Sequence, residues 1–296
     1  MVTARPDRLI RTLARRAARR HRERVLFSAL TPVALAERAE LRSFFLPERP
    51  GPQIAPQALG EPRDMCLIDR WPEPRAVVVV APGDMVLAGD PEVLQPAGLR
   101  ALAHRGLIEA PPTFRSVLQQ AYPDLRPWPR IVYTLQGRPT PPLPVGITVR
   151  RLGADDGKLA GTLHREGKWL WKHYRGPEAM AASGLAWAAI ADERCVSIAL
   201  PLTRGEMFED LAAFTNPSFR GMSLSPACVA KVIEDVMRRG NVPSWSTSVD
   251  HKVSRRVAQK TGFQKDREDF VYITGPELGV STTSRGFATH GPGPMT

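Results

Sequence analysis

Cysteines and metal-ligand motifs are scarce in this sequence. Cys66, Cys195 and Cys228 are odd in number and far apart, a pattern typical of reduced and mostly buried thiols. The chain contains no CxxC pair, and its six histidines form no HxxxH or HExxH pair. We therefore expect no metal site and no disulfide framework, and we predict a cytoplasmic protein.

Long apolar runs are missing as well. Runs such as AVVVVA at 76–81 are far shorter than the roughly 20 residues that a membrane-spanning helix needs. Residues 1–26 contain no apolar stretch of the kind found in secretory signals. The 296 residues are 43% apolar and 24% charged, which predicts an ordinary globular protein with one large domain or two smaller ones.

Positive charge is unevenly distributed. The formal net charge is +11, and residues 1–26 carry nine arginines against only Asp7 and Glu23. The few apolar residues of this segment recur at helical spacing, so we predict a basic amphipathic helix. Such a helix is either a solvated surface element or a contact for the phosphates of a nucleic acid or a membrane surface. A transit peptide is the third interpretation.

The proline-rich segment RPTPPLPVG at 138–146 is the best candidate for a domain boundary. Before it, we predict a small α+β domain over 27–140. Its strand-like runs 75–81 and 84–89 are joined by the turn APGD as a hairpin. Helical patterns cover 32–45 and, in two pieces, 95–122.

Beyond the boundary, we predict a mixed sheet flanked by helices over 147–275, so the fold class is α/β. The expected elements are a strand at 147–152, helices over 155–189, a hairpin at 195–202 and 207–215, a helix at 225–240, a strand at 244–249, a helix at 250–263 and a strand at 270–274. The tail at 276–296 lacks periodicity and is predicted to be disordered.

The stretch PSFRGMSLSPACVAKV at 217–232 follows a predicted strand and opens a predicted helix. Ser225 fits the N-cap of that helix, Pro226 its first position and Gly240 the residue after its end. Such a loop directs free backbone N–H groups at one point, and the helix dipole adds positive potential, so the pattern favours a phosphate site. Arg220 adds a full charge.

The segment 213–263 resembles the core of the GNAT superfamily of N-acyltransferases. The family's donor loop, R/Q-x-x-G-x-G/A, corresponds to the six residues 220–225, and its second signature, N-x-x-S/A before a short helix ending in GF, to His251–Ser254 and Gly262-Phe263. The resemblance covers 195–263 well and weakens toward 147. Residues 69–91 match the N-terminal domain of some two-domain members in part.

The resemblance implies that an amine attacks a thioester, normally that of acetyl-CoA or another acyl-CoA. The strand 207–215 would pair with the pantetheine arm, and the loop would hold the pyrophosphate. We therefore assign the donor site to Phe214, Thr215, Arg220, Gly221, Met222, Ser223, Leu224, Ser225, His251 and Ser254.

The resemblance also implies a general base on or near the strand 207–215. Alternation places Glu209 and Asp210 on opposite faces, so only one points into the site. We expect Glu209 first and Asp210 second; the alternative is that both are solvated edge charges. We assign the acceptor pocket to Glu206 and to the aromatic cluster of Trp169, Trp171 and Tyr174, which otherwise would be core packing.

Four departures from the family pattern concern the donor. Serines replace both loop glycines at positions 223 and 225, and Pro226 removes an N–H from the first helical turn. His251 stands at the usual asparagine, and Ala258 at the position of a tyrosine that often protonates the thiolate. The departures leave the scaffold intact and the identity of the donor open.

Three functions follow. The first is an acyl-CoA-dependent N-acyltransferase acting on a small-molecule amine, in natural-product biosynthesis or resistance. The second uses an aminoacyl group carried on tRNA, bound through the basic N-terminal helix and the Arg/Lys face of residues 238–239 and 252–260. The third is a catalytically silent module that binds nucleic acid or a regulatory ligand.

Overall fold

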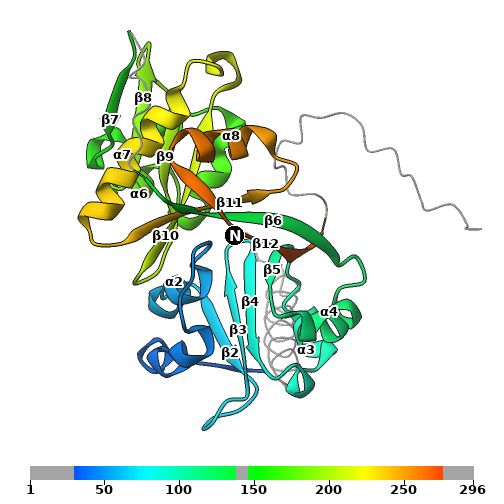
Figure 1. Cartoon of the computed structure of the whole chain (residues 1–296). Coiled ribbons are helices and arrows are strands. Elements are labelled where there is room, and N and C mark those ends of the chain that lie inside the picture. Colours follow the sequence, from blue (N-terminus) through cyan, green and yellow to red (C-terminus); the bar gives the residue numbers. More distant parts are fainter. Residues whose placement is uncertain (1–29, 138–145, 276–296) are drawn as a thin grey trace, which may run out of the picture.

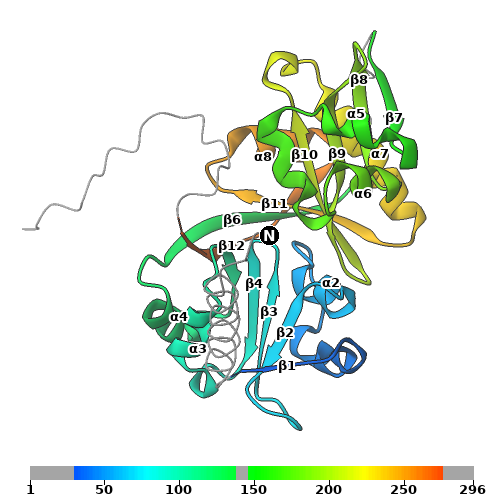
Figure 2. The same cartoon turned by 180° about the vertical axis from the view of Figure 1, so that it is seen from behind.

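The computed structural model describes residues 30–137 and 146–275. Its strands form one mixed sheet of twelve strands, ordered β1-β2-β3-β4-β5-β12-β6-β11-β10-β9-β8-β7. In Figures 1 and 2, β2–β5 lie in the lower part and β7–β10 in the upper part, with β6 and β12 between them. The predicted basic helix 1–26 and the tail 276–296 lie outside the described residues.

The first half of the chain contributes strands β1 to β6 and the helices that connect them. The strands are β1 (Thr31–Pro32), β2 (Met65–Ile68), β3 (Ala76–Ala81), β4 (Asp84–Gly89), β5 (Gly106–Glu109) and β6 (Arg126–Leu135). The α-helices are α2 (Ile54–Gly60), α3 (Pro96–Ala101) and α4 (Arg115–Ala121), and the 3-10 helices are η1 (Leu35–Phe45), η2 (Pro91–Val93) and η3 (Pro112–Phe114).

The second half contributes strands β7 to β12. The strands are β7 (Thr148–Arg151), β8 (Trp187–Ala191), β9 (Arg194–Arg204), β10 (Phe208–Thr215), β11 (Val242–Ser248) and β12 (Phe263–Thr274). The α-helices are α5 (Gly157–Gly161), α6 (Pro177–Ala182), α7 (Leu224–Arg238) and α8 (Lys252–Lys260), and the 3-10 helices are η4 (Ala154–Asp156), η5 (Arg165–His173) and η6 (Pro217–Phe219).

The two halves repeat one topology. From one edge of the sheet inward the strands are β1 to β5, and from the other edge they are β7 to β11. In each half only the fourth and fifth strands pair in parallel, β4 with β5 and β10 with β11. Helices follow the first, fourth and fifth strands of both halves. The chain therefore folds the same element order twice.

The sixth strand of each half is exchanged. Strand β6 pairs with β11 of the second half, and β12 pairs with β5 of the first half. The two exchanged strands also pair with each other, antiparallel, along their length. The proline-rich segment thus divides the sequence but not the sheet, because each half is completed by a strand of the other.

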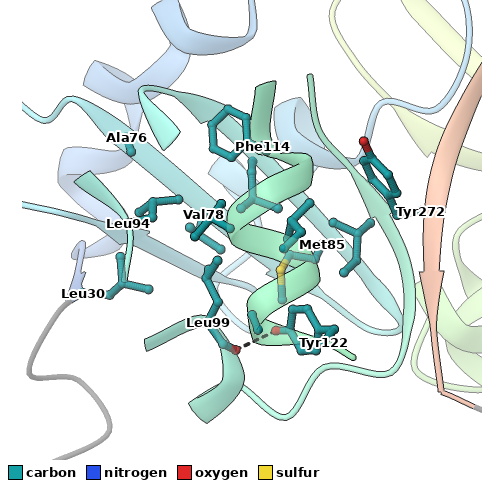
Figure 3. Close-up of a cluster of buried hydrophobic side chains, with 14 of the residues drawn as sticks. Leu30, Ala76, Val78, Met85, Leu94, Leu99, Phe114, Tyr122 and Tyr272 are labelled. Carbon is teal, nitrogen blue, oxygen red and sulfur yellow. Dashed lines mark hydrogen bonds between the residues drawn. The ribbon is translucent and has the colours of Figure 1, made fainter. Parts of the chain in front are cut away.

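Both faces of the first half's sheet are covered, which explains the uninterrupted valines of β3. Val78 and its neighbours pack on one face against Leu99 of α3 and Phe114, as Figure 3 shows. The hydroxyl of Tyr122 donates to the backbone oxygen of Leu99 at 2.6 Å. On the other face, a second cluster that includes Val77 packs against η1 and α2.

The second half has the same two-sided construction. Val229, Val232 and Ile233 of α7 are buried against Leu211 of β10 and Trp245 of β11, as the helical spacing of the sequence predicts. Helices α5 and α6 cover the opposite face. Consecutive residues of β10 therefore point to opposite helical layers, which matters for the two predicted carboxylates.

Several element predictions are corrected by the structure. The segment 95–122 contains strand β5 between its two helices, and β8 occupies the end of the predicted helical stretch 155–189. Strand β12 begins at Phe263, not at residue 270, and the stretch 32–45 is mostly the 3-10 helix η1. The element order of the second half, including the hairpin β9–β10, is otherwise confirmed.

Strand β6 was missed because of its prolines. Pro127 and Pro129 lie in the part of β6 that pairs with β12, whereas the pairing with β11 begins only at Arg130. A proline removes one ladder donor, which a strand tolerates where it has a single neighbour. The two prolines therefore lie in the part of β6 that is paired on one side, by β12. Most of the rest of β6 is paired on both sides, by β12 and β11.

The turn between β9 and β10 anchors the second half on the first. The N–H groups of Glu206 and Met207 donate to the Glu48 carboxylate at 3.0 and 2.8 Å. The N–H of Gln53 donates to Thr203 Oγ1 at 2.8 Å. A Cβ atom on Gly205 would lie 2.5 Å from Glu48 Oε2, so a side chain at this position would displace the Glu48 carboxylate.

Because each half is completed by the other, we expect the described residues to unfold in a single cooperative transition. Phe114→Ala, in the core of the first half, should lower the free energy of unfolding by about 3–5 kcal/mol. Hydrogen exchange of α7, in the second half, should accelerate as much as that of α4. Met65→Ala, at an exposed position of β2, is the control. Unchanged protection of α7 in Phe114→Ala would contradict the prediction.

Candidate active site

Strands β10 and β11 separate partway along their length. They pair from Phe208 beside Val242 to Leu211 beside Trp245. Further on, β10 remains paired only with β9 and β11 only with β6. Residues 212–215 and 246–248 therefore turn unpaired backbone edges toward each other, and we call this region the β10–β11 splay. A bulge in β10 between Asp210 and Leu211 marks its start.

The predicted donor loop lies at the open end of the splay. Gly221 and Ser223 have positive φ angles of 87° and 59°, and α7 begins at Leu224. Within the part of the chain that the structure describes, no backbone acceptor is bonded to the N–H groups of residues 221–225. These free donors and the dipole of the 15-residue helix favour a bound anion.

The helix start differs from the prediction, which placed Ser225 at the N-cap. The N-cap is Ser223, and Pro226 is the third helical residue. The missing N–H of Pro226 falls in the first turn, where no helical bond is lost, but it removes one donor. The Ser225 hydroxyl lies 2.8 Å from Thr215 Oγ1, which lies 2.7 Å from Ser197 Oγ. Ser225 therefore ties α7 to the end of β10.

Arg220 and His251 lie on the two sides of the loop. The Arg220 guanidinium is exposed, and its nearest carboxylate is Glu166 of η5 at 3.6 Å. Burial, followed by the charge of Arg220, lowers the pKa of His251 and so favours its neutral form. The predicted site residue Ser254 accepts a hydrogen bond from Trp245 Nε1 at 3.0 Å, which ties α8 to β11.

Glu209 is held in a buried ion pair. Arg239 donates to its carboxylate from Nε at 3.0 Å and from Nη2 at 2.6 Å, and Asn241 Nδ2 donates at 3.0 Å. Glu209 lies on the α7 side of the sheet and is 1% exposed. The guanidinium and the amide occupy both carboxylate oxygens, which leaves Glu209 poorly placed to meet an acceptor.

Asp210 has a different environment on the opposite face. Its carboxylate accepts hydrogen bonds from Ser244 Oγ at 2.9 Å and from Ser246 Oγ at 2.7 Å. Burial raises the pKa of Asp210 to about 6, against the lowering effect of the two serines. The geometry therefore favours Asp210, the second choice from the sequence, over Glu209.

The first half of the chain closes the site around Asp210. Ser244 Oγ lies 3.4 Å from the backbone oxygen of Gly51. The buried Arg130 of β6 donates to Asp269 at 2.7 and 3.0 Å and to Glu109 at 3.2 and 3.4 Å. Sequence reasoning identified none of these groups. The alternating serines of SWSTS were the one visible signal, since they place Ser244 and Ser246 on one face.

The predicted acceptor residues lie in two separate places, with the aromatic side chains near η5 and Glu206 in the β9–β10 turn. Trp169, Trp171 and Tyr174 lie on or next to η5, where the Tyr174 hydroxyl donates to the Pro201 backbone oxygen. Trp171 Nε1 is buried and has no hydrogen-bond partner among the described residues. Glu206 lies in the β9–β10 turn, pairs with Arg42 and is far along β10 from the loop.

Phe214 anchors η5 on β10. A Cβ atom on Gly167 would lie 2.6 Å from the Phe214 ring, and His164 stacks on that ring at a centroid distance of 6.4 Å. The Phe214 side chain thus packs under η5, while its backbone lies in the splay.

Other features of the described residues carry no comparable chemistry. No group of three or more His, Cys, Asp or Glu in residues 30–137 and 146–275 is placed to hold a metal ion. None of the helices there is long and apolar enough to cross a membrane. A groove of about 540 Å³ lies at the β7 edge of the sheet, away from the splay, lined by Thr148, Arg150, Lys158, Leu159, Thr162, Ile190 and Glu193.

Ser223→Gly should stabilise the protein. A non-glycine residue in the left-handed region costs about 1–2 kcal/mol, and the greater chain entropy of glycine offsets part of the gain. We therefore expect the free energy of unfolding to rise by about 0.5–1 kcal/mol in denaturant titrations. Ser218→Gly, in η6, is the control and should be destabilising. A loss of stability in Ser223→Gly would show that the left-handed conformation of Ser223 is not strained.

Asp210→Asn should stabilise the protein in a pH-dependent way. The folded-state pKa of about 6 lies above the reference value of 3.8, so stability is full below pH 3.8 and is lost as the pH rises through 6. The neutral amide avoids this loss. At pH 7.5 the variant should gain about 2–3 kcal/mol over the wild type, and the gain should vanish near pH 4. A pH-independent difference would argue against the raised pKa.

Comparison with known proteins identifies the family of this chain. A family model for GNAT acetyltransferases matches residues 135–272. An uncharacterized N-acetyltransferase in the mutA 5′ region of Streptomyces virginiae is 36% identical over 203 residues, which cover 67% of this chain and 84% of the relative.

Solved structures share the fold across both halves. A GCN5-related N-acetyltransferase-like protein from Streptococcus suis has a TM-score of 0.62 at 17% identity, over 81% of this chain and 99% of its own. A tandem GNAT protein from the clavulanic acid biosynthesis pathway has a TM-score of 0.54 at 13% identity, over 84% and 99%. With the family match and the Streptomyces relative, these findings show that the chain belongs to the GNAT acetyltransferase family.

Proposed function

We propose that this acetyltransferase forms an amide on a small-molecule amine, with an acyl-CoA as donor and Asp210 as general base. One arrangement carries the proposal: the anion-binding loop and the buried carboxylate lie at opposite ends of the same splay. Residues 210–215 of β10 span about 17 Å at 3.3–3.4 Å per residue, a length suited to an extended pantetheine arm. We keep the cytoplasmic location as a prediction.

The residues at the loop fit a diphosphate. Free N–H groups at 221–225 and the exposed Arg220 supply donors and positive charge. The serines do not obstruct the loop, because Ser225 is turned toward Thr215 and Ser223 adopts the left-handed conformation of a glycine. Unpaired backbone groups of β10 would hold the arm of the donor, which supplies the thioester.

The residues near Asp210 fit proton removal from an amine. The attacking nitrogen must give up a proton as the amide forms, and a base with a pKa near 6 is ionised at neutral pH yet able to accept that proton. Glu209 is less suited, since Arg239 and Asn241 occupy its oxygens. Asp210→Asn should therefore abolish turnover, whereas Glu209→Gln should act mainly through stability.

One observation supports a second candidate donor, an aminoacyl-tRNA. Lys252, Arg256 and Lys260 are exposed along α8 and form no ion pair with another described residue. Arg238 and Arg239, from the same predicted basic face, are instead paired with Asp235 and Glu209. Three adjacent unpaired cations suit a polyanion, although they equally suit the nucleotide of coenzyme A.

Donor binding distinguishes the candidates. We expect acetyl-CoA to bind in calorimetric titrations, and Arg220→Ala to weaken it by about 5–30-fold through the loss of a charge-assisted contact. Arg194→Ala removes an exposed charge of β9 and is the matched control. Bulk tRNA should bind only weakly at 50 and 200 mM salt. Tight, salt-sensitive tRNA binding without acetyl-CoA binding would refute the acyl-CoA proposal and favour the alternative.

A further inference from the structure

Asp210 is too enclosed to meet an acceptor directly. The residue is 3% exposed, and each of its carboxylate oxygens accepts a bond from a serine hydroxyl. Arg130 and the segment around Gly51 lie on the same side of the sheet and close it from the first half. A base that accepts a proton from a bound amine therefore needs a group between itself and the splay.

The two serines differ in their access to the splay. Ser244 pairs with Asp210 in the parallel ladder, is fully buried and also contacts the backbone oxygens of Gly51 and Glu209. Ser246 is the first residue of β11 beyond the last paired position, Trp245, and is partly exposed. Of the two hydroxyls on Asp210, only that of Ser246 borders the splay.

We propose that Ser246 relays the proton of the attacking amine to Asp210, an inference that rests on the proposed function. As the nitrogen–carbonyl bond forms and the carbon–sulfur bond of the thioester breaks, the nitrogen proton passes to Ser246 Oγ. The original hydroxyl proton moves to Asp210 Oδ2 along the 2.7 Å bond. Asp210 returns the proton through Ser246 to the thiolate or to water, so the charges balance. Ser244 positions the carboxylate and takes no part in the relay.

The test compares side chains of equal size at position 246. Ser246→Thr keeps the hydroxyl, whereas Ser246→Val has the same shape, lacks the hydroxyl and leaves no room for a water in its place. Ser244→Ala is the control that removes the other hydroxyl from Asp210. Each variant is measured as the full chain for kcat with saturating acetyl-CoA and amine, for acetyl-CoA affinity by calorimetry, and for Asp210 titration by infrared difference against Asp210→Asn.

We expect Ser246→Val to lose at least 100-fold in kcat, within the range that general acid–base groups contribute. Ser246→Thr should stay within about fivefold of the wild type and keep its acid limb near pH 6, and Ser244→Ala should stay within about tenfold. Acetyl-CoA affinity should be unchanged in all three. Asp210 should titrate at higher pH in both Ser246→Val and Ser244→Ala, because each lacks one hydrogen-bond donor.

Other outcomes separate the relay from the proposed function. If Ser246→Val retains kcat while Asp210→Asn loses it, Asp210 is the base but the relay is wrong. An equal loss in Ser244→Ala and Ser246→Val would also overturn the relay, since it would show that both hydroxyls only position the carboxylate. If Asp210→Asn itself retains kcat, the proposed base fails, and the relay with it.

Discussion

The antiparallel pairing of β6 with β12 is the constraint on which the structure depends. The ladder runs from Leu135 beside Phe263 to Arg126 beside Ile273, and it makes one sheet of two repeated halves. Because β6 crosses into the second half, Arg130 is carried to the face of the sheet that holds Asp210. The same arrangement brings Gly51 onto Ser244. The first half is therefore part of the wall of the site and not a separate appendage.

The two halves share a topology but differ in the loop and helix that follow their fourth strands. In the second half, β10 leads through a loop with free N–H groups into the 15-residue helix α7. In the first half, β4 leads into the six-residue helix α3, which is too short for a strong dipole. The Asp84 carboxylate of β4 instead contacts the second half, because Asp84 Oδ2 lies 3.5 Å from His173 Nε2. Among the residues that the structure describes, the features expected of a donor loop therefore occur together in the second half.

Sequence reasoning succeeded where the determining contacts are local and failed where they are distant. The spacing of Val229, Val232 and Ile233 identifies α7 from local sequence alone, whereas the assignment of the donor loop stays a prediction. Strands β6 and β12 escaped notice because one contains prolines and the other begins with the charged stretch QKDRED, and both form through exchange between halves. The partners of Asp210 come from β11, and Arg239, which decides against Glu209, comes from the far end of α7.

Glu209 and Asp210 show how one strand gives two adjacent carboxylates different surroundings. Glu209 receives a bidentate arginine, so its negative charge is neutralised and its oxygens are occupied. Asp210 lies near Arg130, but Asp269 and Glu109 already share that guanidinium, which leaves Asp210 with serine hydroxyls alone. Neutral donors stabilise a carboxylate less than a cation does, so burial prevails and the pKa of Asp210 stays raised. Because the exchanged strand β6 presents Arg130 already paired, Asp210 keeps the raised pKa that the proposed base requires.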